Sequence, residues 1–365
     1  MKVFCPICNL EKDLSPEEWR CSCGEAWEPG VSDVFEIDKG AHDIWRYRKM
    51  YGLDFEEPYF RMGSGWTPLL PFEIRGREVN FKLEYIAPTA SFKDRGTEVM
   101  INILAHQGVR RIVDDSSGNA GASVAANAAR AGLEADIFVP SYASPDKQAQ
   151  IAVYGAQVHA ISGARVNAKN AALEAVQGEA TLASHAYHPG FLSGQQSLAW
   201  ELWEQLDGQA PDWYVLPVGQ GVHLLGVWLG FKRLLAAGLV DRLPRLVAVQ
   251  PTRLAPIKNA LEKGFETVPE LEPSKPSIAE GLAIASPVRG GRILEAIRET
   301  GGSCITVTDE ATIKAQIQLA KRGLYVEPTS ATVFAALERV FEQATATEII
   351  VLPLTGSGLK GSPGI

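Results

Sequence analysis

The sequence predicts an α/β protein with two doubly wound parallel-sheet lobes and a small cysteine-rich ribbon at its N-terminus. Three observations lead to this prediction. Strand-like and helix-like segments alternate from Val79 onward, glycine- and serine-rich turns follow several strands, and four of the five cysteines lie in the first 23 residues. Such alternation is typical of parallel sheets covered by helices on both faces. We therefore expect each strand to be followed by a helix that packs back onto its sheet.

The N-terminal cysteines form two pairs, Cys5 with Cys8 and Cys21 with Cys23. Two thiolate pairs separated by a hairpin-sized spacer are what a tetrahedral zinc ion needs, because the sulfur ligands must converge without a large core. The second pair has the spacing C-x-C, which is tighter than the usual C-x-x-C. The alternative interpretation, a ribbon whose cysteines are reduced and bind no metal, is therefore kept as well. In both interpretations residues 1–30 form a structural ribbon.

Past the ribbon, residues 38–50 are helix-like, and strand and helix patterns alternate through the rest of the chain. Apolar runs bounded by turn residues indicate the strands, and alanine-rich or amphipathic stretches indicate the helices. We expect strands at 112–115, 135–139, 158–161, 213–218, 246–250 and 349–354. We expect helices at 120–131, at 164–176, at 224–237 and in a segment that begins after Pro145.

Composition narrows the class of protein. A chain of 365 residues with 46% hydrophobic and 21% charged residues can bury a large core. Its net charge of -8 disfavours nucleic acid and anionic membranes as partners. No segment approaches the roughly 18 apolar residues of a spanning helix, and residues 1–10 do not fit a signal peptide. We therefore expect a cytoplasmic protein.

The hexapeptide Ser91-Phe92-Lys93-Asp94-Arg95-Gly96 places a lysine where a helix is expected to begin. We expect Ser91 to cap this helix and Asp94 to reach back to the free amide, as a capping box with Asp in place of Glu. Partial burial and a neighbouring cation such as Arg95 lower the pKa of a lysine and suit it to Schiff-base chemistry with an aldehyde. From these residues alone, a solvated charge triplet stays the alternative.

Two further motifs lie where an expected strand meets an expected helix. Asn119 stands in such a turn, where its amide could reach into a cleft at the carboxyl edge of the sheet or simply cap the helix. The segment 219–223 follows another strand, and its glycines and the helix N-terminus predict a phosphate cradle. A dinucleotide-binding loop is disfavoured, because the spacing is G-x-G-x-x-x-x-G and the next strand ends in Gln250.

Four motifs occur in the order Ala87 to Gly96, Ser116 to Gly121, Gly219 to Gly221, and Thr355 to Lys360. In this order they resemble the threonine synthase branch of the fold-type II pyridoxal-phosphate enzymes, the tryptophan synthase beta superfamily. The resemblance extends over nearly the whole chain. It implies a large cofactor lobe made of 31–96 and 184–365, a small lobe made of 97–183, and a homodimer.

The resemblance also implies the roles of individual residues. Lys93 would form the Schiff base with pyridoxal phosphate and then move protons on the substrate. Asn119 would bond the phenolic oxygen of the cofactor, and Thr355 would meet its pyridine nitrogen. The other implied contacts are with the cofactor phosphate, from Gly219, Gln220, Gly221, Val222 and His223, and with the substrate, from Ser116, Ser117 and His188.

One segment departs from the family pattern N-P-x-R-x-E-G-x-K-T. The matching stretch, 188–197, has Phe191 in place of the arginine and Gln196 in place of the lysine. A dianionic phosphate needs charge-assisted donors, and a phenyl ring supplies none. His185, His188, Lys147 or Arg165 would have to replace them.

Three functions therefore stay open. The first is a threonine synthase, which converts O-phospho-L-homoserine and water to L-threonine and phosphate. The second is a beta-eliminating or beta-replacing enzyme, similar to threonine or serine dehydratases or to cysteate synthase. The third is a catalytically retired regulator that uses the ribbon for a partner, and the intact Lys93 and Asn119 disfavour it.

Overall fold

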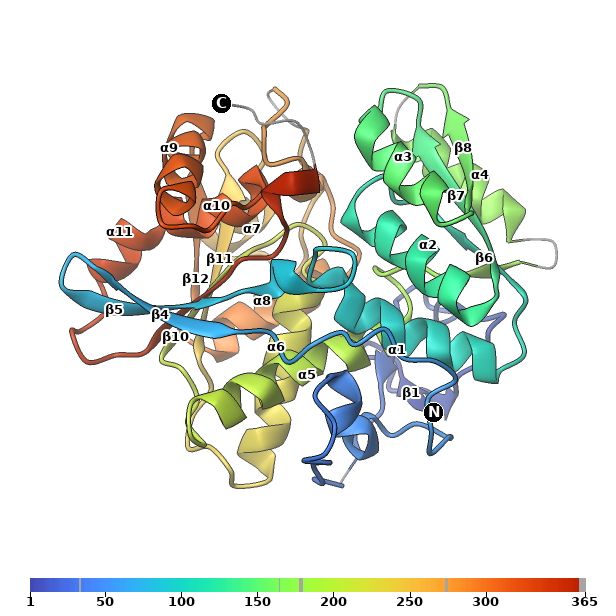
Figure 1. Cartoon of the computed structure of the whole chain (residues 1–365), viewed down its shortest axis with the longest axis horizontal. Helices are drawn as coiled ribbons and strands as arrows, with labels where there is room; N and C mark the ends of the chain where they lie inside the picture. Colours follow the sequence, from blue (N-terminus) through green and yellow to red (C-terminus); the bar gives the residue numbers. More distant parts are fainter. Residues whose placement is uncertain (33, 164, 177–179, 273–274, 361–365) are drawn as a thin grey trace. The chain divides into compact units, whose positions relative to one another are not determined.

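The computed structural model describes residues 1–32, 34–163, 165–176, 180–272 and 275–360, and the chain divides into two compact units (Figure 1). Unit 1 comprises Met1–Trp66 and Ala87–Ser197, and unit 2 comprises Thr67–Ile86 and Leu198–Ile365. Both units contain parallel strands and helices, so the predicted α/β class is confirmed. The lobes predicted at 31–96 with 184–365 and at 97–183 stay a prediction.

Unit 1 begins with the ribbon and continues with strands that alternate with helices. Its elements are β1 (Lys2–Phe4), β2 (Glu11–Asp13), β3 (Glu28–Pro29), η1 (Ile44–Tyr51), α1 (Lys93–His106), β6 (Arg111–Asp114), α2 (Asn119–Ala131), β7 (Glu134–Pro140), α3 (Pro145–Val153), β8 (Gln157–Ile161), α4 (Arg165–Ala175), β9 (Thr181–Leu182) and the first half of α5 (Pro189–Gln205). Within the described residues, its main sheet has the order β8-β7-β6-β9, with every pair parallel. Helix α4 lies on one face of this sheet, and α2 and α3 lie on the other (Figure 1).

Helix α2 fits closely against its neighbours because most of its side chains are small. It is rich in alanine, and its buried residues include Ala120, Ala122 and Ala125. Small side chains let the helix approach both α1 and β7. The helix ends at Gly132, whose φ of 72° allows its amide to bond back to the carbonyls of the last turn. The alanine-rich helix expected from the sequence is confirmed.

Unit 2 carries the longer sheet. Its elements are β4 (Leu69–Ile74), β5 (Arg77–Lys82), η2 (Glu84–Ile86), the second half of α5, β10 (Trp213–Pro217), α6 (Val222–Ala236), β11 (Arg245–Pro251), α7 (Pro256–Glu262), η3 (Glu280–Leu282), α8 (Gly290–Glu299), β12 (Ser303–Val307), α9 (Asp309–Ala320), α10 (Pro328–Ala335), α11 (Leu337–Phe341), β13 (Ile350–Pro353) and η4 (Gly358–Lys360). The described strands have the order β12-β11-β10-β13-β5-β4, and all pairs are parallel except β4 with β5.

The strands of unit 2 are covered on both faces. Every residue of β10 and β13 is buried, which explains why these strands read as continuous apolar runs without alternation. Helices α9 and α10 lie on one side of the sheet, and α5 and α6 lie on the other (Figure 1). An apolar core that includes Phe81, Val249 and Leu319 fills the first of these layers.

The ribbon is a small antiparallel sheet of order β2-β1-β3. The helix expected at 38–50 is shorter than predicted. It is the 3₁₀ helix η1, and its backbone leaves helical values at Tyr47. Its start is fixed by Asp43, whose carboxylate accepts a hydrogen bond of 2.9 Å from the amide of Trp45. Since residues before Asp43 lie outside the cap, the helical pattern there was misleading.

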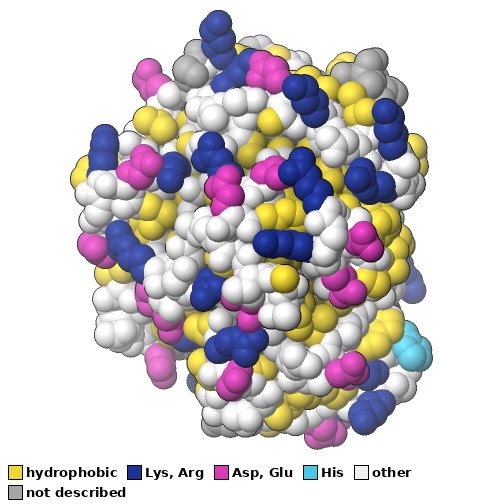
Figure 2. Space-filling model, turned by 90° about the vertical axis from the view of Figure 1, so that its left-hand side faces the viewer, with side chains coloured by type: hydrophobic (Ala, Val, Ile, Leu, Met, Phe, Trp, Pro, Cys, Tyr) yellow, Lys and Arg dark blue, Asp and Glu magenta, His cyan; other side chains and the backbone are white. Residues whose placement is uncertain are grey.

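In the described part of the chain, no helix has the length and apolar character needed to cross a membrane. Figure 2 shows one face of the molecule, on which Lys and Arg side chains are interspersed with Asp and Glu. Hydrophobic side chains occupy small areas between them. This face therefore presents a mixed charge pattern without a field of one sign.

Candidate active site

Lys93 is the first residue of α1, as the hexapeptide predicts. Its ammonium lies 4.7 Å from the centre of the Phe92 ring and 5.8 Å from that of Phe191. Phe191 is fully buried at 0% exposure. A Cβ on Gly96 would lie 2.6 Å from Cγ of Phe191, so only glycine lets this ring pack against the first turn of α1. The ring that replaces the family's arginine is therefore part of the lysine's immediate surroundings.

The capping box expected at this helix start is wrong. The N-cap residue is Phe92 without a side-chain cap, and Oγ of Ser91 is buried without a hydrogen-bond partner in the described structure. The carboxylate of Asp94 instead accepts hydrogen bonds of 2.6 Å from the amide and hydroxyl of Thr89 and from the hydroxyl of Ser123. A buried carboxylate needs such donors from several directions, and the neighbouring loop and α2 supply them. Asp94 thus fixes the loop before Lys93 to α2.

Arg95, expected as a neighbouring cation of Lys93, is also fully buried. Its guanidinium donates a hydrogen bond of 3.2 Å to the hydroxyl of Ser197 on α5. The same helix contributes Gln195, whose amide nitrogen donates to the carbonyl of Phe92 at 3.1 Å. Two side-chain contacts therefore hold the first turn of α1 against α5, and both involve residues within two positions of Lys93.

The segment 184–191 follows β9 and includes the first turn of α5. Its turn is closed by hydrogen bonds from the amides of Tyr187 and His188 to the carbonyl of Ser184, at 3.2 and 2.9 Å. His188 is 5% exposed, and its Nδ1 accepts a hydrogen bond of 3.1 Å from the amide of Gly190. Phe191 follows three residues later in the same segment. One compact turn thus holds His188, which is predicted to contact the substrate, and Phe191, which stands where the family pattern has arginine.

His185 was a candidate to replace the missing cations. Its ring lies 5.9 Å from that of Phe191, and its Nδ1 is buried with no hydrogen-bond partner in the described chain. Burial lowers the pKa of His185 well below its usual value, and the positive charges of Lys93 and Arg165 lower it further. A neutral imidazole can donate or accept one hydrogen bond, but it does not neutralise a phosphate. His185 therefore suits a polar, uncharged part of a substrate.

The turn after β6 brings the predicted residues Ser116, Ser117 and Asn119 together at the N-terminus of α2. The amide of Ser116 bonds the carboxylate of Asp114 at 3.3 Å, and the hydroxyl of Ser116 accepts from the amide of Gly118 at 3.4 Å. Burial raises the pKa of Asp114 to about 7, and the nearby Asp115 adds to this effect. Asn119 is the first residue of α2, so amides of this turn point toward any anion bound there.

In unit 2, the predicted cradle joins β10 to α6. Gly221 is the N-cap residue of α6 and has a φ of 76°, which favours glycine. A Cβ on Gly219 would lie 2.7 Å from the carbonyl oxygen of Gly281. The side chain of Gln220 is hydrogen-bonded within unit 2, because its Oε1 accepts from the amide of Val288 at 3.0 Å. The loop therefore presents backbone to a ligand at the start of a long helix, and Val222 is the first residue of that helix.

His223 completes this loop from the inside. Its Nε2 lies 2.7 Å from the hydroxyl of Tyr214 on β10, and the residue is 3% exposed. The sequence pattern placed His223 among residues around the cofactor phosphate. The structure gives Nε2 of its ring a partner on the preceding strand, and the expected role of His223 near the cofactor phosphate stays a prediction.

Thr355 follows β13 and is 1% exposed. Its hydroxyl lies 2.9 Å from that of Ser330, which also accepts a hydrogen bond of 2.8 Å from the amide of Gly356. Sequence reasoning did not single out Ser330, because its role depends on α10 meeting the end of β13. The pair fixes the position and the hydrogen bonding of the Thr355 hydroxyl.

These residues fit pyridoxal phosphate chemically. Unit 1 supplies the amine of Lys93 for an aldehyde, together with two buried polar atoms that have no hydrogen-bond partner among the described residues, Oγ of Ser91 and Nδ1 of His185. Unit 2 supplies a backbone cradle in which neighbouring atoms leave no room for a Cβ on Gly219 or Gly221, and it supplies the hydroxyl of Thr355. Such a set meets the needs of an aldehyde, a phosphate and a pyridine nitrogen.

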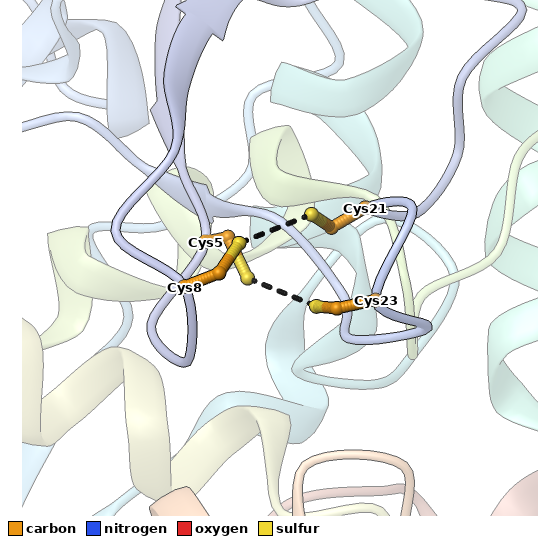
Figure 3. Close-up of side chains that lie close together, drawn as sticks. All are labelled: Cys5, Cys8, Cys21 and Cys23. Atoms are coloured by element: carbon orange, nitrogen blue, oxygen red, sulfur yellow. Dashed lines mark hydrogen bonds between the residues drawn. The ribbon is translucent and has the colours of Figure 1, made fainter.

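The four N-terminal cysteines converge in the ribbon (Figure 3). The sulfurs of Cys5 and Cys23 lie 3.5 Å apart, as do those of Cys8 and Cys21, and all four lie within 4.8 Å of one another. Tetrahedral zinc with Zn–S bonds of about 2.3 Å needs sulfurs roughly 3.8 Å apart. The amide of Cys23 lowers the pKa of Cys21 to about 7, which favours the thiolate that a metal binds. The cluster fits a zinc ion.

Comparison with known proteins places these features in a family. A family model described as "Pyridoxal-phosphate dependent enzyme" matches residues 60–356. The threonine synthase of Methanocaldococcus jannaschii is 32% identical over 375 residues, which covers 98% of this chain and 92% of that protein. The threonine synthase of Synechocystis sp. is 32% identical and covers 87% of this chain and 82% of its own.

Solved structures agree with this placement. Maize serine racemase matches with a TM-score of 0.70 and 26% identity, over 80% of this chain and 88% of its own. The threonine deaminase of T.th. matches with a TM-score of 0.69 and 28% identity, over 81% of this chain and 94% of its own. The chain therefore belongs to the pyridoxal-phosphate dependent enzyme family, as a threonine synthase-like protein of fold type II.

Proposed function

We propose that this protein is a lyase that converts O-phospho-L-homoserine and water to L-threonine and phosphate. The observation that carries the proposal is the position of Lys93 at the start of α1, where its charge helps to lower the pKa of the buried His185 in the 184–191 segment. Curated relatives named threonine synthase support it, because the similarity to the first of them covers 98% of this chain. We further propose a cytoplasmic homodimer that acts on a small amino acid and binds neither nucleic acid nor a membrane.

Pyridoxal phosphate, when bound, withdraws electrons from the α carbon of an amino acid and so makes protons there removable. The amine of Lys93 would take and return protons at the α and β carbons, since an amine displaced from the cofactor aldehyde by the substrate is then free to act as a base. Ser116, Ser117 and Asn119 would orient the substrate carboxylate and the cofactor from the N-terminus of α2. The backbone of 219–223 would hold the phosphate of the cofactor.

Beta chemistry is a second candidate that one observation specifically favours. The ring of Phe191 lies beside Lys93, and the lowered pKa of His185 leaves its imidazole neutral. Neither side chain supplies the positive charge that a leaving phosphate needs. A neutral leaving group such as the hydroxyl of threonine or serine makes no such demand. The 28% identity with a threonine deaminase is in accord with this alternative.

The two candidates differ in their products. The purified protein with pyridoxal phosphate is mixed with O-phospho-L-homoserine, and phosphate and amino acids are measured. Equal amounts of phosphate and threonine are expected. A protein that releases no phosphate but forms a keto acid from L-threonine or L-serine would replace the first candidate by the second. Lys93→Ala in parallel identifies background reaction, because it removes the proposed proton carrier.

For the ribbon we propose a structural zinc ion bound by Cys5, Cys8, Cys21 and Cys23. The expected result is one zinc per chain by elemental analysis of protein purified without added metal. Cys21→Ser should lower this content to near zero. Cys304→Ser is the matched control, because Cys304 belongs to β12 of unit 2, is buried and lies 3.8 Å from Oε1 of Gln250. Metal-free protein with four titratable ribbon thiols would support the reduced ribbon instead.

A further inference from the structure

The ribbon carries an aromatic side chain that contacts the rest of unit 1. Trp19 lies in the loop between β2 and Cys21, and its ring centre lies 4.7 Å from that of Tyr187, with the planes at 82°. This edge-to-face geometry is the one that aromatic pairs prefer. The loop is held from within the ribbon, because the indole nitrogen of the buried Trp27 donates to the carbonyl of Glu18 at 3.1 Å. The loop that carries Trp19 is therefore held in place by a hydrogen bond to the residue just before Trp19.

Tyr187 receives this contact at the centre of the 184–191 segment. Its hydroxyl accepts a hydrogen bond of 3.3 Å from the ammonium of Lys169 on α4, so Tyr187 is fixed by both α4 and the ribbon. Its own amide bonds the carbonyl of Ser184 within the turn. The turn cannot shift without moving Tyr187, and the same turn carries the buried His185 and His188.

A second contact joins the ribbon to the helix of the lysine. Gln107, the C-cap residue of α1, donates a hydrogen bond of 2.9 Å to the carbonyl of Leu14. The ribbon thus contacts α1, which begins with Lys93, and the turn that carries His188. These are two of the parts of unit 1 on which the proposed chemistry depends, the third being the turn before α2. An appendage without influence on the site would not need to contact both.

We propose that Trp19 is a positioning residue, which holds the 184–191 turn through Tyr187 and so sets the geometry of the substrate site. The inference rests on the proposed function only in taking His185 and His188 to face a substrate. Lys93 itself lies on α1, whose first turn is held against α5 by the contacts of Arg95 with Ser197 and of Gln195 with Phe92. The loss of Trp19 therefore weakens substrate binding more than it slows proton transfer, and it leaves cofactor binding intact.

The experiment compares Trp19→Ala, Tyr187→Ala and the double variant in the full chain with pyridoxal phosphate. An aromatic pair of this kind is worth roughly a threefold to tenfold change in an equilibrium constant. We expect each single variant to raise KM for the substrate, O-phospho-L-homoserine or L-threonine, by roughly threefold to tenfold. The value of kcat should change less than about twofold, and the double variant should resemble the single ones, since one contact is lost in all three.

Two control variants separate positioning from a general loss of structure. Trp19→Phe keeps a ring and should restore most of the wild-type KM. Tyr142→Ala removes an aromatic side chain that is 70% exposed and should leave KM unchanged. An unchanged KM in Trp19→Ala, or effects that simply add in the double variant, would overturn the proposal.

Hydrogen exchange gives a readout that does not depend on activity. In Trp19→Ala, the amides of 184–191 should exchange faster, while those of the α1 segment 93–106 keep their protection. An equal rise in both segments would mean general destabilisation and would contradict a positioning role. The measurement also works if neither substrate is turned over, so a failure of the proposed function is distinguishable from a failure of this inference.

Discussion

The two units contribute differently to the candidate site. In unit 1, several buried polar atoms near Lys93 in sequence or space have no hydrogen-bond partner in the described chain, and they are Oγ of Ser91, Nδ1 of His185, Oγ of Ser193 and Oε1 of Gln195. In unit 2, the hydroxyl of Thr355 is paired with Ser330, and Gln220 is paired with the amide of Val288. Among these described residues, those of unit 1 leave hydrogen bonds unmade, and those of unit 2 are bonded within their own unit.

This difference has a physical meaning. A buried polar group without a partner costs about 1 to 3 kcal/mol, so such groups are rare unless a ligand satisfies them. Those close to the lysine are in accord with a site in unit 1 that receives a polar ligand, and another such atom, Oε1 of Gln107, lies at the opposite end of α1. The paired side chains of unit 2 leave the backbone of its glycine loop to bind an anion, with little rearrangement. We therefore propose that residues of unit 1 recognise the substrate and that the glycine loop of unit 2 binds the cofactor phosphate.

The largest expected effect comes from Lys93. Lys93→Ala removes the amine on which the chemistry depends, so activity should fall on the order of a thousandfold or more, and the visible absorption band of the bound cofactor should change. Lys263→Ala is a matched control, because Lys263 also has its ammonium 5.9 Å from an aromatic ring, that of Phe265, but on an exposed loop. A Lys93→Ala protein with the wild-type spectrum would refute the assignment.

The anchoring role of unit 2 is tested by Gly221→Ala. The residue has a φ of 76°, and an added Cβ would overlap the side chain of Ile293. We expect affinity for pyridoxal phosphate to fall about tenfold, since strain of about 1 kcal/mol combines with the displacement of the loop amides. Fluorescence titration with the cofactor measures it.

Gly238→Ala is the control for Gly221→Ala. Gly238 has a φ of 69°, with nothing within 4 Å of the added Cβ. It imposes similar backbone strain at the end of α6 without touching the cradle. Its melting temperature should fall while its cofactor affinity stays at the wild-type value. Equal affinity losses in both variants would mean that strain alone explains the result.

The sequence predicted local features well and tertiary ones poorly. Lys93 at a helix start and the glycine loop at Gly221 were predicted because their signals lie within a few neighbouring residues. The strand order of unit 2 was not predicted, since it depends on pairings between distant segments. The partners of Asp94 were predicted wrongly for the same reason. Ser123 lies 29 positions away and reaches the carboxylate only in the fold.

A smaller effect, on the free energy of unfolding, is expected to distinguish the hydroxyl of Ser91, which has no hydrogen-bond partner in the described chain, from that of Ser123, which has one. Ser91→Ala removes an oxygen that has no partner in the described chain, so the free energy of unfolding of the cofactor-free chain should stay constant or rise by up to about 1 kcal/mol. Ser123→Ala removes a donor to the buried Asp94 and should cost about 1 to 3 kcal/mol. Urea unfolding measures both. If Ser91→Ala also weakens cofactor or substrate binding severalfold, the unmade bond belongs to a ligand.

The smallest effect concerns a buried carboxylate of unit 1 that needs no ligand. Glu98 accepts hydrogen bonds from the indole of Trp45 at 2.7 Å and from the amides of Met62 and Ser64 at 2.9 and 3.2 Å. Burial nevertheless raises its pKa from 4.5 to about 7. The folded chain then binds this proton more tightly than the unfolded chain, so stability is gained as pH falls from about 7 toward 4.5.

Comparison with Glu98→Gln isolates this contribution, because every other titrating group, including Asp114, is common to both proteins. The difference in unfolding free energy, wild type minus variant, should rise by about 1 kcal/mol for each unit by which the pH falls from 7 to 5. It should be the same with and without pyridoxal phosphate, since Glu98 already has its partners. A difference that is flat in pH would mean that Glu98 is ionised in the fold. A difference that changes when the cofactor binds would mean that the hydrogen bonding of Glu98 depends on the ligand. The polar groups of unit 1 that respond to a ligand would then extend beyond the residues around Lys93.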